Sequence, residues 1–262
     1  ILNDDMPFLV DSLTAELSRH GFTIREMFHP IFRVKRDGKG KLTELGTTKE
    51  KGFSPESYIY FEISILPEGM TETELETDLH WVLKNIRLAV EDWRKIESKV
   101  GEIIKELERP RAHADTAMAR EVEDFLHWLI DRNFVFLGYG EYRLVKDKGQ
   151  ESLVSTPSDK LGILRITDEL MSADSGSMPP EASHFLHSPQ LVEITKSNRR
   201  SPVHRPVQMD TISLKRHDDK GRVIGEVRFV GLFTSNVYYQ SSAEIPLVRR
   251  KIAHVLERSN FE

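Results

Sequence analysis

The feature that most constrains this chain is a long run of apolar residues spaced three and four apart. The run holds helical phase from Leu75 to Leu107, and Thr71 with Glu74 forms a candidate capping box in front of it. The spacing predicts a helix over 71–108, about 57 Å long at about 1.5 Å per residue. Because that length exceeds the width of a domain of about 100 residues, part of the helix should connect to, or pack against, a second module.

Two sequence features are expected to end this helix or to interrupt it. Gly101 is a poor helix former inside the run, and it is expected to break the helix. Pro110 disfavours helical backbone at the residue before it, so 109–113 is the best linker candidate, and Asp115 can cap the helix that follows. The expected domains are therefore 1–109 and 114–262.

The residues before the long helix predict the order strand, helix, strand, strand. A short strand should be under way at residue 1, and Pro7 should begin a helix that ends at Gly21. One strand should follow over 22–34, then a turn at 37–40 and a polar loop. The last strand of this module should cover 58–65, with Ile59, Phe61, Ile63 and Ile65 on one face.

The second half reads as a helix, several strands and a closing helix. Apolar residues from Val122 to Ile130 share one helix face, and Gly138 with Gly140 should mark either a bulge or close packing inside a strand. Residues 167–188 are expected to be a flexible loop with a short helix. The expected strands are 133–145, 151–155, 190–196 and a hairpin over 210–235 that turns at 218–221, and the closing helix should start at 244–246.

Composition excludes several classes of function. The chain is 39% hydrophobic and 30% charged, as in globular proteins, and 42 acids against 37 bases give a net charge of −5 without a basic field. Nucleic-acid and membrane partners are therefore disfavoured. No cysteine is present, which excludes disulfides and thiolate chemistry. We expect a cytoplasmic protein, since neither a signal peptide nor an 18-residue apolar run occurs, and we expect the chain to be part of a longer one.

Clusters of candidate ligands have two interpretations each. Asp4, Asp5 and Asp11 suit a metal, but acids at a helix start are also favoured by the helix dipole. His184 and His187 have metal-ligand spacing without a third ligand of matching spacing. A metal hydrolase that uses Asp4, Asp5 and His184 is therefore the weakest functional hypothesis, and we predict no metal site.

The other motifs are also more typical of structure than of catalysis. The glycine pairs at 38–40 and 138–140 lack the third glycine of a dinucleotide fingerprint, and neither a phosphate loop nor a nucleophile elbow occurs. The basic residues at 199, 200, 204 and 205 suit either an anion site or a solvated loop. Trp128, Tyr139 and Tyr142 should belong to a core. We therefore predict no catalytic residue and no cofactor site in this chain.

Three stretches resemble a known family. They are NDDMPFLVDS (3–12), FVFLGYGEY (134–142) and RFVGLFTSNVYYQSSAEIPLVRRK (228–251). They resemble the N-terminal regulatory region of the large bacterial NAD-specific glutamate dehydrogenases. The predicted element order and the segment 5–10 also resemble the ferredoxin-like ACT module, a small amino-acid sensor whose D-x-P-G-L-L sequence enters the first helix.

The resemblance implies an α+β fold and a regulatory role. A strand-helix-strand-strand-helix ACT module would be followed by an antiparallel-sheet module flanked by helices, which is PAS-like, GAF-like or a divergent ACT module, in that order of preference. No fourth ACT strand is predicted, since residues 86–107 keep helical phase where it would fall, so either the module is incomplete or this amphipathic run contains a strand. The intact enzyme would use NAD to deaminate glutamate to 2-oxoglutarate, and its catalytic domain and other subunits would be the partners of this region.

The resemblance also places a candidate effector site in the first loop. Family modules hold an amino acid there with backbone groups near a helix N-terminus. The residues at these positions are Asn3, Asp4, Asp5, Met6, Pro7 and Phe8. Phe8 stands where the ACT pattern has glycine, and its side chain is expected either to fill the effector space or to pack in the core beside Leu9 and Leu13. Two roles are therefore open, an amino-acid sensor and a purely architectural module without ligand.

Overall fold

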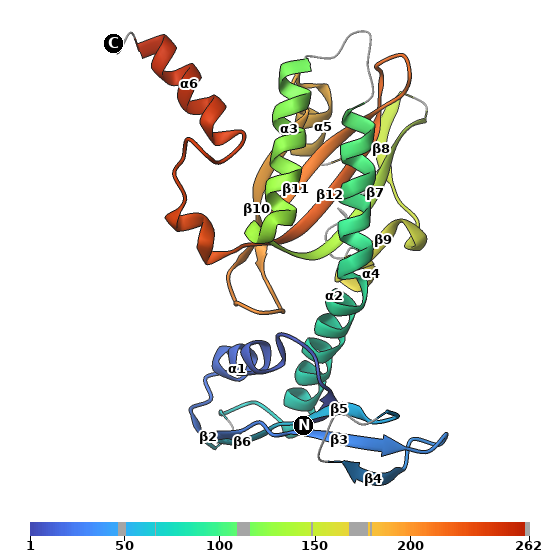
Figure 1. The fold of residues 1–262 in the computed structure, drawn as a ribbon, viewed down its shortest axis with the longest axis vertical. Coiled ribbons are helices and arrows are strands. Elements are labelled where there is room, and N and C mark those ends of the chain that lie inside the picture. The colour runs from blue at the N-terminus through green and yellow to red at the C-terminus, as the bar shows by residue number, and fades with distance from the viewer. Residues whose placement is uncertain are drawn as a thin grey trace. The chain divides into compact units, whose positions relative to one another are not determined.

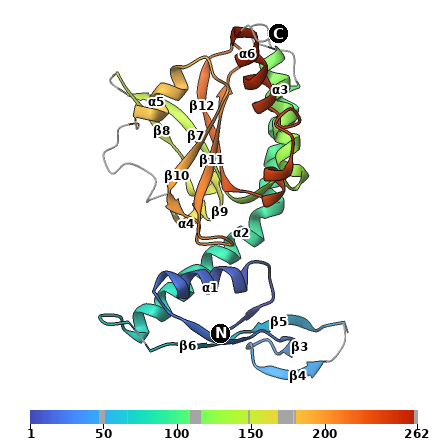
Figure 2. The ribbon, with the colours of Figure 1, turned by 90° about the vertical axis from the view of Figure 1, so that its left-hand side faces the viewer.

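The chain divides into two compact units, which Figures 1 and 2 show from two sides. The structure, a computed structural model, describes residues 1–46, 51–65, 67–108, 116–147, 149–167, 178 and 180–259. Unit 1 comprises Ile1–Val90 with Ser201–Val207, and unit 2 comprises Glu91–Arg200 with Gln208–Glu262. The division between Val90 and Glu91 falls inside the long helix α2 (Glu72–Leu107). The predicted linker at 109–113 lies outside the described residues, so the domain limits 1–109 and 114–262 stay predictions.

The long apolar run forms a single helix, α2 (Glu72–Leu107), as predicted. The capping box is present: the Thr71 N–H donates to Glu74 Oε2 (2.8 Å), and the Glu74 N–H donates to Thr71 Oγ1 (3.2 Å). The predicted break at Gly101 is wrong, because that residue lies within the helix. A mid-helix glycine costs only about 1 kcal/mol, which the burial of Val100 and Ile104 beside it offsets.

Unit 1 places an antiparallel sheet against α1 and the first half of α2 (Figure 1). The chain enters it as β1 (Leu2–Asp4), and α1 (Leu9–Arg19) ends at Gly21 as predicted, where φ is +82° and the Gly21 N–H donates to the Ser18 carbonyl (3.0 Å). The described strands form one sheet in the order β1-β5-β3-β4 and a two-stranded sheet β2-β6. Their bounds are β2 (Ile24–Phe28), β3 (Ile31–Arg36), β4 (Leu42–Gly46), β5 (Ser54–Tyr58) and β6 (Tyr60–Ile63).

Two predictions for this sheet need correction. The strand expected over 22–34 is interrupted at His29 and Pro30, which separate β2 from β3. The polar loop expected after the 37–40 turn is instead β4, which pairs with β3 as the edge of its sheet. Charged side chains are typical of edge strands, so the polarity of this segment hid the strand.

The two ladders of unit 1 keep one register across the interruption. Phe28 pairs with Tyr60 in β2-β6, and Phe32 pairs with Glu56 in β3-β5. Both partners therefore move by four residues between the two pairs, so no residue is gained or lost between the ladders. Even-numbered residues of both strands therefore share one face, and odd-numbered residues share the other. Ile59, on the odd face, is 1% exposed in the core that also contains the apolar residues of α1.

Unit 2 is built on an antiparallel sheet in the order β10-β11-β12-β7-β8, with β9 paired to β7. Helix α3 (Thr116–Trp128) and the second half of α2 pack on it through a cluster that includes Val122, Phe125, Phe229 and Ile212. The strands are β7 (Phe134–Asp147), β8 (Gln150–Val154), β9 (Lys160–Gly162), β10 (Val192–Arg200), β11 (Gln208–His217) and β12 (Val223–Phe233); the other helices are α4 (Leu164–Thr167), α5 (Pro180–His187) and α6 (Val248–Ser259).

The aromatic and glycine predictions for unit 2 are confirmed. Tyr139 and Tyr142 are 1% and 8% exposed, and Trp128 is partly buried against the same cluster. A Cβ on Gly138 would lie 2.9 Å from Leu164 Cγ, and one on Gly140 would lie 2.8 Å from the Tyr142 ring. Glycine is therefore required at both positions for close packing.

The ends of the second half deviate slightly from the prediction. The closing helix begins at Val248 rather than at 244–246, because Leu247 before it has a left-handed backbone (φ +67°). The short helix expected within 167–188 is α5, whereas 168–177 lies outside the described residues. None of the helices in the described ranges is long and apolar enough to cross a membrane.

Candidate functional site

The predicted effector loop joins β1 to α1, and its polar side chains already have protein partners. Arg87 of α2 binds both Asp4 Oδ2 (2.7 Å) and Asn3 Oδ1 (3.1 Å). The Asp5 N–H donates to the Pro55 carbonyl (3.1 Å), and Asp5 Oδ1 accepts from Ser57 Oγ (2.7 Å). The loop is thus tied to α2 and to β5, which fixes its backbone.

Asp5, Ser57 and His29 form a hydrogen-bonded chain that resembles a hydrolase triad only in composition. Ser57 is fully buried, and its hydroxyl lies 2.9 Å from His29 Nε2 and 2.7 Å from Asp5 Oδ1. In a hydrolytic triad the imidazole lies between the hydroxyl and the carboxylate, so that it can accept the hydroxyl proton. Here the hydroxyl lies between the other two groups. The chain therefore supports the loop and gives no nucleophile.

Phe8 has an unusual backbone for its residue type. It directly precedes α1 with φ +73°, in the left-handed region that glycine adopts without strain. Its carbonyl accepts from the Ser12 N–H (3.0 Å) and the Ser12 hydroxyl (2.6 Å), and no side chain caps the α1 N-terminus. The prediction that Pro7 begins the helix is wrong by two residues, because the turn at Phe8 delays the helix to Leu9.

The side chain of Phe8 packs on a segment that sequence reasoning did not connect with it. Phe8 is half-buried, and its ring lies 5.2 Å from that of His204 in the segment Ser201–Val207. The His204 N–H donates to Ser12 Oγ (2.9 Å), and its Nδ1 lies 3.1 Å from Asp11 Oδ2. His204 is one of the basic residues considered as an anion site, but its ring nitrogen lies next to the Asp11 carboxylate instead. About 190 positions separate the partners, and neither segment carries a pattern that predicts the other.

Glycine at position 8 should cost much less stability than alanine. In both variants the half-buried ring is lost, but only glycine adopts the left-handed backbone freely, a difference of about 1–2 kcal/mol. We expect the free energy of unfolding of Phe8→Gly, measured in urea, to exceed that of Phe8→Ala by at least about 1 kcal/mol. Equal stability of the two variants would show that the backbone at residue 8 relaxes when the ring is removed.

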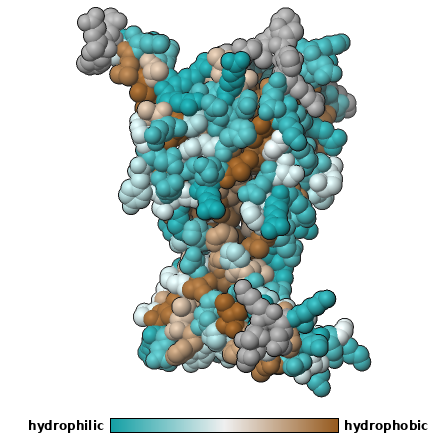
Figure 3. Space-filling view, viewed as in Figure 1, coloured by the Kyte–Doolittle hydropathy of each residue, from teal (hydrophilic) through white to brown (hydrophobic). Residues whose placement is uncertain are grey.

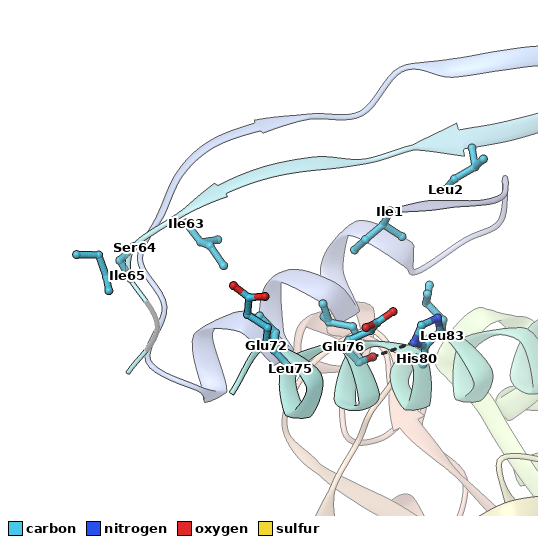
Figure 4. A pocket seen from close by; sticks show the side chains of 11 residues that line it. Ile1, Leu2, Ile63, Ser64, Ile65, Glu72, Leu75, Glu76, His80 and Leu83 are labelled. Atoms are coloured by element: carbon cyan, nitrogen blue, oxygen red, sulfur yellow. Dashed lines mark hydrogen bonds between the residues drawn. The ribbon is translucent and has the colours of Figure 1, made fainter. Parts of the chain in front are cut away.

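A pocket of about 700 Å³ lies in unit 1, beside the loop rather than within it. Figure 4 shows its walls, with Ile1 and Ile63 on the strand side and Leu83 on α2. Glu72, Glu76 and His80 stand along the same helix. The remaining lining residues are Leu2, Ser64, Ile65, Leu75 and Leu79. Leu75 and Leu79 belong to the apolar run that predicts the helix, and they are only half-buried because they line this pocket.

Within the described ranges, one group of metal-type side chains has its ligand atoms within 4.8 Å of one another: Glu16, His20 and Asp78. His20 Nε2 lies 3.1 Å from Glu16 Oε1 and 2.8 Å from Asp78 Oδ2. Arg19 Nη2 lies close to all three, at 2.5 Å from Glu16, 2.7 Å from His20 and 3.3 Å from Asp78. The guanidinium takes the place of a cation, so this group forms an ion-pair network between α1 and α2.

The residues of the metal-hydrolase hypothesis have other surroundings. Asp4 and Asp5 are held by Arg87 and Ser57, as described above, and none of Asp4, Asp5 and His184 belongs to the group around His20. His187, weighed with His184, lies 3.1 Å from Glu151 Oε2. Among the residues that the structure describes, none of these four side chains belongs to a group of three or more with metal-site spacing.

Comparison with known proteins agrees with the resemblance seen in the sequence. Residues 1–79 match the family model of the glutamate dehydrogenase ACT1 domain. The whole chain is 37% identical to an NAD-specific glutamate dehydrogenase of Halomonas elongata and 35% identical to one of Pseudomonas aeruginosa, and it spans 16% of the length of each. An NAD-specific glutamate dehydrogenase of Mycobacterium tuberculosis is 26% identical over 95% of the chain.

Proposed function

We propose that this chain, whose residues 1–79 match the family model of the glutamate dehydrogenase ACT1 domain, is a regulatory segment of a large NAD-dependent glutamate dehydrogenase. The observation that carries the proposal is the alignment of the whole chain with one part, 16% of the length, of relatives with that name. The intact protein would oxidise glutamate to 2-oxoglutarate with NAD. The segment would contribute amino-acid sensing and subunit assembly to it, and its partners would be the catalytic domain and the other subunits.

The proposed effector site is the loop from Asn3 to Phe8. Its support is the uncapped N-terminus of α1, whose first N–H groups can receive a carboxylate, favoured by the helix dipole. The left-handed backbone at Phe8 also gives a reason for glycine in the ACT pattern, since glycine adopts that conformation without strain. An amino-acid carboxylate at α1, with its ammonium near Asp4 or Asp5, is the binding mode that these groups favour.

Calorimetry of the purified chain with a panel of amino acids tests this site. A ligand at 100 times its dissociation constant should stabilise the protein by about 2.7 kcal/mol and raise its melting temperature by several degrees. Asp5→Asn should weaken binding, whereas Leu79→Gln in the neighbouring pocket should leave it unchanged. If only the Leu79→Gln variant lost the heat of amino-acid binding, the binding site would be the pocket of Figure 4 instead of the loop. Flat calorimetry across the panel would exclude sensing.

A second function, architectural assembly without ligand, is favoured by a different observation. The segment Ser201–Val207 already lies on the N-terminal turn of α1, with the rings of His204 and Phe8 in contact. A half-buried Phe8 that is held this way would limit access to the helix N-terminus. Under this alternative His204→Ala lowers stability, yet no amino acid binds to either protein.

Catalysis is assigned to the rest of the intact protein. The sequence lacks the dinucleotide-binding glycines, and the Ser57 hydroxyl donates its one proton to Asp5 rather than to the His29 imidazole. Glutamate-dependent formation of NADH by the purified chain, above a heat-killed control, would refute this assignment.

Unit 2 is proposed as a sensor-like module of the PAS or GAF kind. The antiparallel order β10-β11-β12-β7-β8, with the short helices α4 and α5 between β9 and β10, is consistent with that assignment. A divergent ACT module is the alternative. An experimental structure of unit 2, compared with solved sensor domains, would decide between the two.

A further inference from the structure

The outer face of the unit 1 sheet carries large apolar side chains that no part of the described chain covers. Even-numbered residues share this face across the continuous register, and neighbouring strands add Leu2 opposite Tyr58 and Leu45 opposite Val34. We call this set the aromatic face, and Figure 3 shows apolar side chains at the surface of this unit. Its members and their exposed fractions are Leu2 (56%), Phe28 (57%), Phe32 (45%), Leu45 (63%), Tyr58 (47%) and Tyr60 (45%).

The aromatic face is pre-organised. Phe28 packs on Tyr60 with ring centroids 6.0 Å apart, and Phe32 packs on Tyr58 at 6.4 Å. Such pairs lose little conformational freedom when a partner covers them, so they suit a binding surface. Contiguous apolar patches of this kind on water-soluble domains mark interaction sites, whereas single exposed apolar residues do not.

We propose that the aromatic face is the contact between two copies of this chain, arranged face to face about a two-fold axis. This inference deepens the assembly role under "Proposed function" and does not depend on amino-acid sensing. A buried aromatic side chain covers roughly 150–250 Å², so six half-exposed apolar side chains offer roughly 500 Å² per copy. Two copies would bury about 1,000 Å², the lower limit for a specific interface.

The charges around the face favour a second copy as the occupant. Arg36 binds Glu56 through two bonds of 2.6 Å, which lowers the pKa of that carboxyl and leaves no uncompensated charge in the middle of the face. Glu26 and Glu62 are paired across the strands at one end only. If the strands of the two copies run antiparallel, the end of the face with Glu26 and Glu62 in one copy lies far from the same end in the other. These glutamates of the two copies therefore do not meet.

Sedimentation equilibrium of the purified chain tests the proposal. Wild-type protein should form dimers, and Phe32→Lys or Tyr58→Lys should raise the dimer dissociation constant at least about 30-fold, as the loss of a central hot-spot residue does. Ile65→Lys is the matched control, because Ile65 is an equally apolar residue of unit 1 that is 90% exposed outside the aromatic face. It should dimerise like wild type.

Circular dichroism and melting temperature must show that each variant is folded before its mass is interpreted. A chain that is monomeric at about 100 μM, or dimers that are unchanged in both lysine variants, would overturn the proposal. The result is independent of calorimetry with amino acids, so a failed dimer leaves sensing untouched, and a failed sensor leaves the dimer untouched.

Discussion

Alanine in place of Gly162 should lower the free energy of unfolding of the protein by about 3 kcal/mol or more. Gly162 ends β9 with φ +62°, and a Cβ there would lie 2.1 Å from the Leu137 carbonyl oxygen. Backbone atoms cannot rotate away from such a contact as a side chain can, so β9 would have to separate from β7. Urea unfolding followed by far-ultraviolet circular dichroism measures the loss.

Gly149→Ala is the matched control for this prediction. Gly149 also has a left-handed backbone (φ +85°), but a Cβ at this residue would have no other atom within 4 Å. Its replacement should therefore cost only the conformational term of about 1–2 kcal/mol. If both variants lost the same stability, the cost at Gly162 would come from backbone conformation alone, and the close approach of β9 to β7 would contribute nothing.

Local sequence signals predicted the helices and turns well. The capping box of Thr71 and Glu74, the glycine end of α1 at Gly21 and the 218–221 hairpin turn each depend on a few neighbouring residues, and each is confirmed. The prediction at Gly101 was wrong because the low helix propensity of glycine is outweighed by the buried apolar residues on both sides of it, which keep α2 continuous.

Which face of the unit 1 sheet is buried was harder to predict. Phe28 and Phe32 share a parity with Val34, and that pattern suggests a buried face. The opposite parity is apolar too, as Ile59 and Phe61 show, so alternation alone does not say which face meets the helices. The structure buries Ile59 and Val34 but exposes Phe28 and Phe32, so two of the three residues that this pattern assigns to a core belong to the aromatic face.

The candidate site was predicted in part. The sequence placed a loop over 3–8 between a strand and a helix; in the structure Asn3 and Asp4 belong to β1, and only 5–8 form the loop before α1. It gave no indication of Arg87, Ser57 or His204, the side chains that hold this loop and the start of α1, because these contacts join residues between 52 and 192 positions apart. Long-range contacts of this kind depend on the fold as a whole, and no local pattern encodes them.

The expected loss from Asp92→Ala is also about 3 kcal/mol, and it should depend on pH. Asp92 is 1% exposed, and its carboxylate accepts from the Gly162 N–H (3.0 Å), Lys95 (2.7 Å) and Arg165 (3.3 Å). The side chains of Lys95 and Arg165 are 65% and 44% exposed, so solvent screens their ion pairs and each contributes little. The larger part of the loss comes from the buried Gly162 N–H, which would have no acceptor.

The pH dependence follows from the pKa of the Asp92 carboxyl. Burial raises this pKa, but the hydrogen bonds from Lys95 and Gly162 outweigh burial and hold it below its ordinary value of 3.8. A carboxyl with a lowered folded-state pKa stabilises the protein above its unfolded-state pKa, and this contribution is lost as pH falls through the folded-state value.

Asp92→Asn keeps an acceptor for the Gly162 N–H but has no charge, so it should lose less stability than alanine at pH 7. Its deficit in stability relative to wild type should shrink below about pH 4. Urea unfolding of wild type and both variants at pH 7 and at acid pH measures this. A deficit of Asp92→Asn that is constant with pH would mean that the charge of Asp92 adds nothing to the stability of unit 2.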